Sequence, residues 1–427
     1  MRAWALLVIA LLLLPLGGSL AVAESCGGRP PVNVARLPGV TPQGLPSVGL
    51  QPAQVRRSTC NYLMLSLKGR VEYVSGAHVL LRGPDGHLRL YDLRSRRAYA
   101  LDQGPVLSPK TDGRWVVYAK YWLAEGQPLR YRWYSGLPVL ARAYPGAEPN
   151  RSEIYALDLA SGRRRLVASS RMPGYSTTTL PQLDLSEGRL VYRIVRGDPT
   201  APTSEVHLVE LASGRDQVLR TYRWPRYVHE VAIDGSLVAW SLITARDAGR
   251  PSATARVYLY DLATDRGRIV SGSGRDWHPD LAAGRVAWVR AGALDSPGRI
   301  VLYAVSSGRA TQVTCSRGAS GDRCLADRLV IGDRVLAWHA PDGRQVQYDL
   351  LSGRTESLDQ EGQMVTPSTD GLEEAWSAAY SVGRGQGERV VYRSTVLLYR
   401  GADERSLPRM PRTGGGGMAW SEGCGRR

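Results

Sequence analysis

Two histidines occupy matching positions in neighbouring repeats of this sequence, each a few residues before a glycine turn. His229 is followed directly by Glu230, and His278 is followed by Pro279 and Asp280. Imidazole and carboxylate groups together can act as general acids and bases or as ligands of a divalent metal. If their strands face one channel, His229, Glu230, His278 and Asp280 form the catalytic site of a lyase or hydrolase. The alternative, which the repeat favours, is a packing and turn-forming role with no metal and no cofactor.

Other catalytic signatures are missing from the sequence. It contains no Gly-x-Ser-x-Gly motif, which excludes the nucleophile elbow of the α/β-hydrolases. It contains no Asp-x-Asp-x-Asp loop for calcium and no Cys-x-x-Cys pair for structural zinc. The sequence therefore favours a non-enzymatic binding or scaffold protein, and the histidine site is the alternative.

Repeated β-strands are the elements that position these residues. A run of alternating large residues, followed by a tight turn that glycine usually closes, recurs with copies that begin at Leu90, Ile154, His207, Tyr258, Leu302 and Gln347. It alternates with a glycine turn followed by a strand that usually ends in an aromatic residue, with turns at 76, 113, 188, 235, 284, 332 and 371. These turns divide residues 76–400 into units of about 46 residues, close to the length of a four-stranded propeller blade. We therefore predict an all-β fold, a β-propeller with seven four-stranded blades or with six blades plus terminal strands.

The repeat also resembles that of a known family. The stretch from Asp276 to Trp288, in which a His-Pro-Asp run precedes a glycine turn, resembles the repeat of TolB-like propellers. The tyrosine strands with their Ser-Gly turns are similar to the second half of that repeat, and the likeness covers residues 71–401. It implies a TolB-like, WD-repeat-like β-propeller, and it supports partner binding by analogy only.

The N-terminus predicts export. An apolar run from Ala3 to Leu16 is followed by small residues that end at Ala23, and the run is shorter than the roughly 20 residues of a membrane-spanning helix. The expected organisation is a signal peptide over 1–23, a Pro/Gly-rich leader over 24–60, the propeller over 61–401 and a tail over 402–427. A strand at 62–67, or one at 418–421 in the tail, would close the ring. The mature protein is expected to be secreted or periplasmic.

Five cysteines fit an oxidising compartment. Cys315 and Cys324 are close in sequence and are candidates for a local disulfide. Cys26, Cys60 and Cys424 lie near the two chain ends, where one pair among them would tie the ends together; spacing leaves the connectivity open. Acylation of Cys26 would anchor the protein to lipid, which is the alternative to free secretion or periplasmic residence.

The charge balance is strongly basic, with a formal net charge of +16. All but three of the 55 basic residues are arginine, the exceptions being Lys68, Lys110 and Lys120. This charge is compatible with attraction to an anionic cell-surface polymer, but the scatter of the arginines through the repeats favours a compositional bias toward arginine. No nucleic-acid-binding module is present. We expect a monomer without a transmembrane span that binds a protein or an anionic polymer.

An insertion at about 121–150 in the second unit is rich in aromatic residues and arginine. These residue types are enriched at binding hot spots, and long loops on rigid scaffolds often carry recognition. The insertion either forms a binding surface or covers the edge of one blade. The candidate binding residues are Tyr121, Trp122, Arg130, Tyr131, Arg132, Trp133 and Tyr134.

Overall fold

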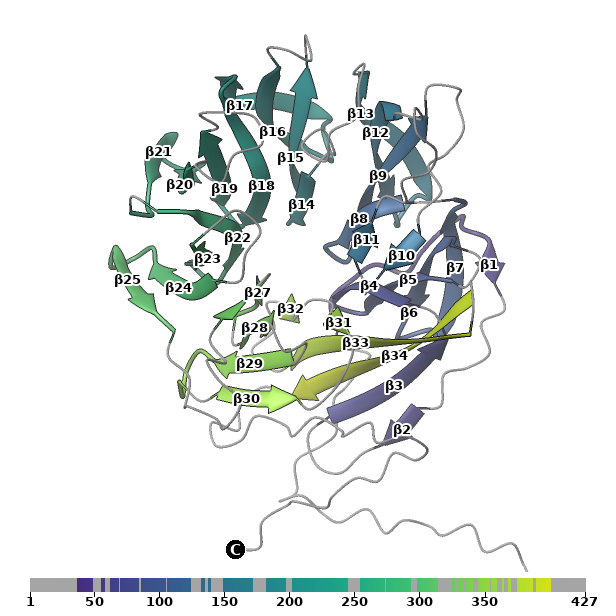
Figure 1. Cartoon of the computed structure of the whole chain (residues 1–427). Helices are drawn as coiled ribbons and strands as arrows, with labels where there is room; N and C mark the ends of the chain where they lie inside the picture. The colour runs from purple at the N-terminus through teal and green to yellow at the C-terminus, as the bar shows by residue number, and fades with distance from the viewer. Residues whose placement is uncertain are drawn as a thin grey trace, which may run out of the picture.

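Antiparallel β-sheets arranged in a ring make up the protein, as the repeat predicts (Figure 1). This computed structural model describes residues 37–400, except 49–54, 58–61, 69, 84–85, 105, 124–131, 135–136, 140–148, 172–181, 197–201, 245–253, 273, 293–297, 314–324, 327–328, 334, 341–344, 354, 359–362, 365–367, 370–374 and 387–388. Within the strands, side chains are not described at 55–70, 121–150, 171, 339, 345 and 356–400. The described residues contain no helix, and therefore none that could cross a membrane. The predicted signal peptide, the tail and all five cysteines, including Cys315 and Cys324, lie outside the described residues.

Six blades have four strands each, and each strand pairs antiparallel with the next one in the blade. Blade 1 contains β4 (Arg70–Ser75), β5 (His78–Arg82), β6 (Leu88–Asp92) and β7 (Arg97–Asp102), with β1 (Ser47–Val48) added outside β7. Blade 2 contains β8 (Val106–Thr111), β9 (Trp115–Leu123), β12 (Pro149–Asp158) and β13 (Arg163–Arg171). Blade 3 contains β14 (Gln182–Ser186), β15 (Arg189–Arg196), β16 (Thr203–Glu210) and β17 (Arg215–Arg223).

The remaining three blades follow the same order. Blade 4 contains β18 (Arg226–Asp234), β19 (Leu237–Thr244), β20 (Thr254–Asp261) and β21 (Arg266–Ile269). Blade 5 contains β22 (Asp276–Ala282), β23 (Arg285–Ala291), β24 (Gly298–Ala304) and β25 (Arg309–Gln312), with β26 (Leu325–Ala326) beside β24. Blade 6 contains β27 (Leu329–Ile331), β28 (Val335–His339), β29 (Gln345–Asp349) and β30 (Thr355–Leu358).

A closing sheet contains strands from both ends of the described chain. Its members are β2 (Val55–Arg57), β3 (Tyr62–Lys68), β31 (Gln363–Met364), β32 (Ser368–Thr369), β33 (Ala375–Gln386) and β34 (Arg389–Arg400). The early strand predicted at 62–67 is β3, which pairs with β34, whereas 418–421 lies outside the described residues. The sheet contacts β4 of blade 1 and β28 of blade 6. The protein thus has the second of the two predicted arrangements, six blades plus terminal strands.

The turns of the repeat define two faces of the ring. Glycines with positive φ close the turns between first and second strands, such as Gly188, and between third and fourth strands, such as Gly214. Because antiparallel strands alternate in direction, both kinds of turn lie on one side of a blade. We call this side the turn face. The opposite side, where each outermost strand passes to the next blade, is the loop face.

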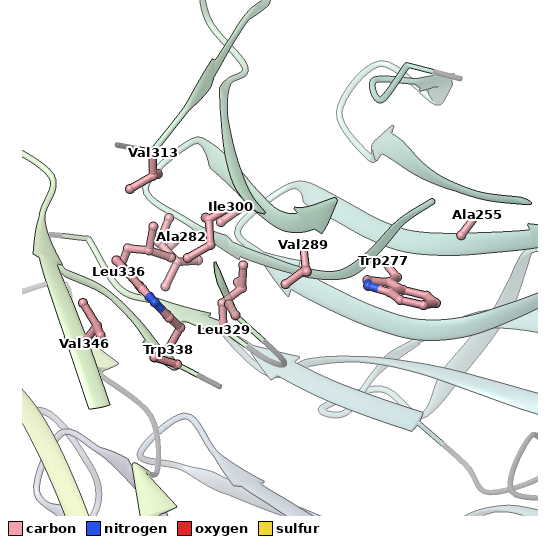
Figure 2. Close-up of a cluster of buried hydrophobic side chains, with 14 of the residues drawn as sticks. Ala255, Trp277, Ala282, Val289, Ile300, Val313, Leu329, Leu336, Trp338 and Val346 are labelled. Atoms are coloured by element: carbon pink, nitrogen blue, oxygen red, sulfur yellow. The ribbon is translucent and has the colours of Figure 1, made fainter. Parts of the chain in front are cut away.

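Tryptophans from the second strands form the cores between blades. Trp338 of blade 6 packs in one buried cluster with Val289 and Ile300 of blade 5 (Figure 2). Trp277, in the innermost strand of blade 5, belongs to the same cluster and has 1% of its surface exposed. This packing buries sheet faces that a single blade would leave in water.

Arginines from outermost strands also join consecutive blades. Arg165 of blade 2 donates to the Leu211 carbonyl of blade 3. Arg220 of blade 3 lies 4.9 Å above the ring centroid of Tyr260 in blade 4. Arg268 of blade 4 donates to the hydroxyl of Tyr303 in blade 5 at 2.9 Å. Part of the arginine content is therefore structural.

The segment 37–48 runs across the turn face of blades 1 and 2, and we call it the strap. The amide of Ala77 donates to the carbonyl of Pro38 at 2.8 Å, and the amide of Val40 donates to the carbonyl of Gly113 at 2.8 Å. His78 is fully buried, and its Nε2 donates to the carbonyl of Val40 at 2.9 Å. The strap therefore joins two blades through backbone hydrogen bonds and one histidine.

Candidate functional site

The innermost strands β4, β8, β14, β18, β22 and β27 contact one another in this order around the centre of the ring (Figure 1). Four of them contain a β-bulge. The strand register is interrupted between Val71 and Tyr73, Leu107 and Lys110, Val228 and Val231, and Trp277 and Asp280. A bulge changes the direction in which side chains leave a strand, and bulges often occur beside functional sites. Both predicted histidines lie within such bulges.

The bulges of β18 and β22 bring His229, Glu230 and His278 together, and we call these three residues the axial cluster. Each offers one ligand atom, and these atoms all lie within 4.8 Å of one another. His278 Nδ1 donates to Glu230 Oε2 over 2.5 Å. The imidazoles of His229 and His278 meet edge to face, with centroids 5.8 Å apart. Two neighbouring blades therefore converge on one point, as the sequence alternative requires.

The surrounding structure holds His278 in a strained backbone conformation. Its φ is +50°, in the left-handed region that a residue with a Cβ rarely adopts. Such a conformation costs roughly 1–3 kcal/mol and persists only where the surroundings impose it. Here the preceding residue, Trp277, is buried in the hydrophobic cluster, near Ala255 of blade 4 (Figure 2), and the following residue is Pro279. The conformation that directs this imidazole toward the axial cluster therefore lowers the stability of the fold.

The axial cluster is capable of two kinds of chemistry. Two imidazoles and one carboxylate are a common ligand set for divalent first-row metals such as Zn²⁺. Ligand atoms of a tetrahedral Zn²⁺ lie about 3.4 Å apart. Donor atoms within 4.8 Å of one another thus need only small side-chain movements to bind one ion. Alternatively, Glu230 orients His278 in the manner of a general acid–base pair. In both cases the side chains are only partly accessible, 8% for His278 and 20% for Glu230.

Asp280, the fourth predicted residue, belongs to a different group. Its Oδ2 accepts the amide of Ile331 at 2.8 Å, which ties blade 5 to blade 6. Burial raises its pKa to about 7, against the opposing effect of Lys110. The structure thus gives Asp280 an inter-blade hydrogen bond in addition to its place near the ring centre.

A lysine at the centre of the ring joins several blades. Lys110 Nζ lies 3.2 Å from Asp184 Oδ1 and 4.6 Å above the ring of Tyr73. Burial alone would lower the pKa of Lys110, but Asp184, Tyr73 and Asp280 outweigh it and raise that pKa. Asp184 in turn accepts the amide of Ile233 at 2.9 Å. This Lys110 network therefore braces blades 1, 2, 3 and 5 electrostatically.

The axial cluster and the Lys110 network lie at different depths. Innermost strands run from the loop face to the turn face, because the glycine turns follow them. His229 lies six residues before Gly235 and His278 six before Gly284, whereas Lys110 lies only three before Gly113. The axial cluster is therefore nearer the loop face.

Sequence analysis missed the Lys110 network. A signal for it was nevertheless present, since lysine occurs at only three positions in a chain that otherwise uses arginine. Lys120 likewise contacts a carboxylate, that of the buried Asp102. In such a composition a lysine on an innermost strand indicates a specific buried partner.

The predicted binding residues of the insertion are only partly placed. Their backbone contributes the end of β9 at Tyr121 and Trp122, and the hairpin of β10 (Arg132–Tyr134) with β11 (Leu137–Val139). Arg130 and Tyr131 lie outside the described residues, as do the side chains of the whole insertion. A binding role for the insertion stays a prediction.

Comparison with known proteins returns solved structures of propellers. No model of a protein family matches the chain, and no curated protein matches its sequence. An oligogalacturonate lyase in complex with manganese is 13% identical, with 85% of this chain and 98% of that chain covered and a TM-score of 0.46. TolB from Acinetobacter baumannii is 16% identical, with 79% and 80% covered and a TM-score of 0.35.

A third similar structure is the β-propeller domain of the Trilobed protease from Pyrococcus furiosus. It is 9% identical, with 82% of this chain and 94% of that chain covered and a TM-score of 0.46. The chain is a β-propeller. At these identities and TM-scores the likenesses carry no information on what it binds, so function must come from its own residues.

Proposed function

We propose that the axial cluster binds a divalent metal cation and that the protein, exported from the cytoplasm, uses this site to bind and cleave an anionic polymer as a lyase or hydrolase. The main support for this proposal is that one ligand atom from each of His229, Glu230 and His278 lies within 4.8 Å of the other two. Three protein ligands leave coordination positions for water or a ligand oxygen, as in catalytic rather than structural metal sites. The net charge of +16 supports an anionic ligand.

Each residue of the axial cluster has a definable part in such a site. A bound divalent cation would polarise a ligand carboxylate or lower the pKa of a bound water molecule. The bulges of β18 and β22 hold His229 and His278 toward one point. Glu230 supplies the carboxylate, and its contact with His278 fixes the orientation of that imidazole.

A non-enzymatic binding or scaffold protein is the second candidate. The strongly basic composition favours it, because long-range attraction to an anionic partner needs no catalytic group. In this case the metal site would hold one charged group of the polymer without turnover. The aromatic and arginine residues of the insertion, Tyr121 to Tyr134, would then add contacts to a protein or polymer.

The test is cleavage of an acidic polysaccharide with and without metal. Purified mature protein is incubated with polyuronates in Zn²⁺, in Mn²⁺ and in a chelator. Elimination produces a double bond that absorbs in the ultraviolet, and hydrolysis produces reducing ends only. We expect metal-dependent product that His229→Ala abolishes and His87→Ala, a histidine outside the innermost strands, leaves unchanged. Metal-dependent binding without product would favour the second candidate, whereas neither binding nor product would contradict a site for acidic polysaccharides.

A further inference from the structure

An exposed tryptophan lies at the loop face between blades 3 and 4. Trp224 connects β17 to β18, and 40% of its surface is exposed. The five other tryptophans whose side chains are described, Trp115, Trp240, Trp277, Trp288 and Trp338, are all buried. Trp224 is held in place, because its amide donates to the carbonyl of Pro202 at 3.1 Å. Its ring lies nearly parallel to that of Tyr227, at 13° and with centroids 6.1 Å apart.

Three exposed arginines lie on the strand ends that flank this connection between blades 3 and 4. Arg223 precedes Trp224 and Arg226 follows it by two residues. Arg196 lies on the same side of blade 3, since Thr203 pairs with both Arg196 and Arg223 in the strand register. Two strand spacings separate Arg196 from Arg223, which is about 10 Å.

The charge of this surface favours an anion. Glu205 pairs with Arg196 at 3.2 Å and also contacts His207 at 3.1 Å, so its charge is shared. Within the part of the chain that the structure describes, neither Arg223 nor Arg226 forms an ion pair with an acidic side chain. We call Arg196, Arg223, Trp224, Arg226 and Tyr227 the loop-face patch.

The same strand connects the loop-face patch to the axial cluster. β18, labelled in Figure 1, begins at Arg226, and His229 follows three residues later. Three residues of extended chain span about 10 Å. Both the patch and the axial cluster lie toward the loop face. A ligand that occupies both the patch and the axial cluster must therefore span about 10 Å, which requires more than one monomer unit.

We infer that the loop-face patch binds an acidic oligosaccharide, with a sugar ring stacked on Trp224 and carboxylates bound by Arg223 and Arg226. A planar guanidinium binds carboxylates in a bidentate manner. An indole face packs against the apolar C–H face of a pyranose ring, a surface that polyphosphate lacks. Arg196 and Arg223 lie about 10 Å apart, a spacing that suits charges repeated along a stiff chain better than those of a flexible acidic peptide. This inference rests on the proposed function in making the ligand a polymer that continues to the axial cluster.

Direct binding measurements test the inference on the whole mature protein. Calorimetry is carried out with an oligouronate, with its carboxyl-reduced neutral counterpart and with poly-glutamate. We expect Trp224→Ala to weaken oligouronate binding by about tenfold or more, as for an aromatic hot spot. Arg223→Gln with Arg226→Gln should do the same and should also reduce the salt dependence. Arg163→Gln with Arg309→Gln removes the same charge from exposed positions on the turn face and should change affinity less than about twofold.

The outcomes separate this inference from the proposed function. Binding that persists in a chelator and in His229→Ala, but falls in Trp224→Ala, supports the patch even if the metal site fails. Failure of oligouronate to bind, equal binding of the neutral counterpart, or unchanged binding by Trp224→Ala would overturn it. Poly-glutamate binding as tightly as the oligouronate would also overturn it, in favour of an acidic peptide.

Discussion

Acid should weaken the strap that crosses blades 1 and 2, because His78 must stay neutral there. Burial lowers the pKa of His78 to about 4 from its ordinary value of 6.5. The unfolded chain therefore takes up a proton near pH 6.5 that the folded protein takes up only near pH 4. Between these values the unfolded state binds more protons, so stability is complete above pH 6.5 and decreases as the pH falls. Linkage gives a loss of about 2 kcal/mol at pH 5 and about 3 kcal/mol at pH 4 from this one group.

The variant His78→Gln isolates the effect. Glutamine does not titrate, and its amide N–H can replace the Nε2 donor to the carbonyl of Val40. We expect the free energy of unfolding of the wild type, measured by urea titration at pH 7, 6, 5 and 4, to fall relative to that of His78→Gln by these amounts. His87→Gln, a histidine of the same blade, is the matched control. Parallel pH profiles for the wild type and His78→Gln would refute the reasoning.

Three further predictions concern single side chains. Burial alone would lower the pKa of His207, but Asp216 and Glu205 outweigh it and raise that pKa. The stabilising contribution of His207 is therefore present below pH 6.5 and is lost as the pH rises through the raised pKa, so His207→Gln should cost more stability in thermal unfolding at pH 6 than at pH 9. Gly76 and Gly235 both have φ +54°, but a Cβ on Gly76 would lie 2.2 Å from the carbonyl oxygen of Pro38, whereas a Cβ on Gly235 would meet open space. Gly76→Ala should therefore lower the free energy of unfolding in urea by about 2 kcal/mol more than Gly235→Ala does. Equal costs would argue against the placement of the strap. Trp338→Ala empties the core between blades 5 and 6 and should cost about 3–5 kcal/mol in the same titration; a cost below about 1 kcal/mol would contradict this packing.

The repeat made the fold predictable, since each glycine turn and each tyrosine strand is a local signal. It also made the axial cluster predictable as an alternative. His229 and His278 occupy equivalent positions in adjacent repeats, and the innermost strands of adjacent blades contact each other. What the repeat leaves undetermined is the register within the innermost strands. The bulges at Val228–Val231 and Trp277–Asp280 follow from packing between blades and have no local sequence signal.

Features outside the repeat could not be predicted in the same way. The strap depends on contacts between residues far apart in sequence, such as Val40 with Gly113. Lys110 and Asp184 lie on contacting innermost strands of adjacent blades, but the bulge between Leu107 and Lys110, which changes the direction of the lysine side chain, has no local sequence signal. Trp224 lies in a connection between blades, where an aromatic residue looks like any other core tryptophan until its exposure is known.

Binding of a metal to the axial cluster is the measurement on which the functional proposal depends most directly. The mature protein is stripped with a chelator, and Zn²⁺ and Mn²⁺ binding is then followed by calorimetry in the wild type, in His229→Ala with His278→Ala, and in His87→Ala as control. The convergence of His229, Glu230 and His278 predicts one ion per chain in the wild type and in the control, and none in the double variant. Absence of stoichiometric binding in the wild type, or equal binding in the double variant, would contradict a metal site at the centre of the ring.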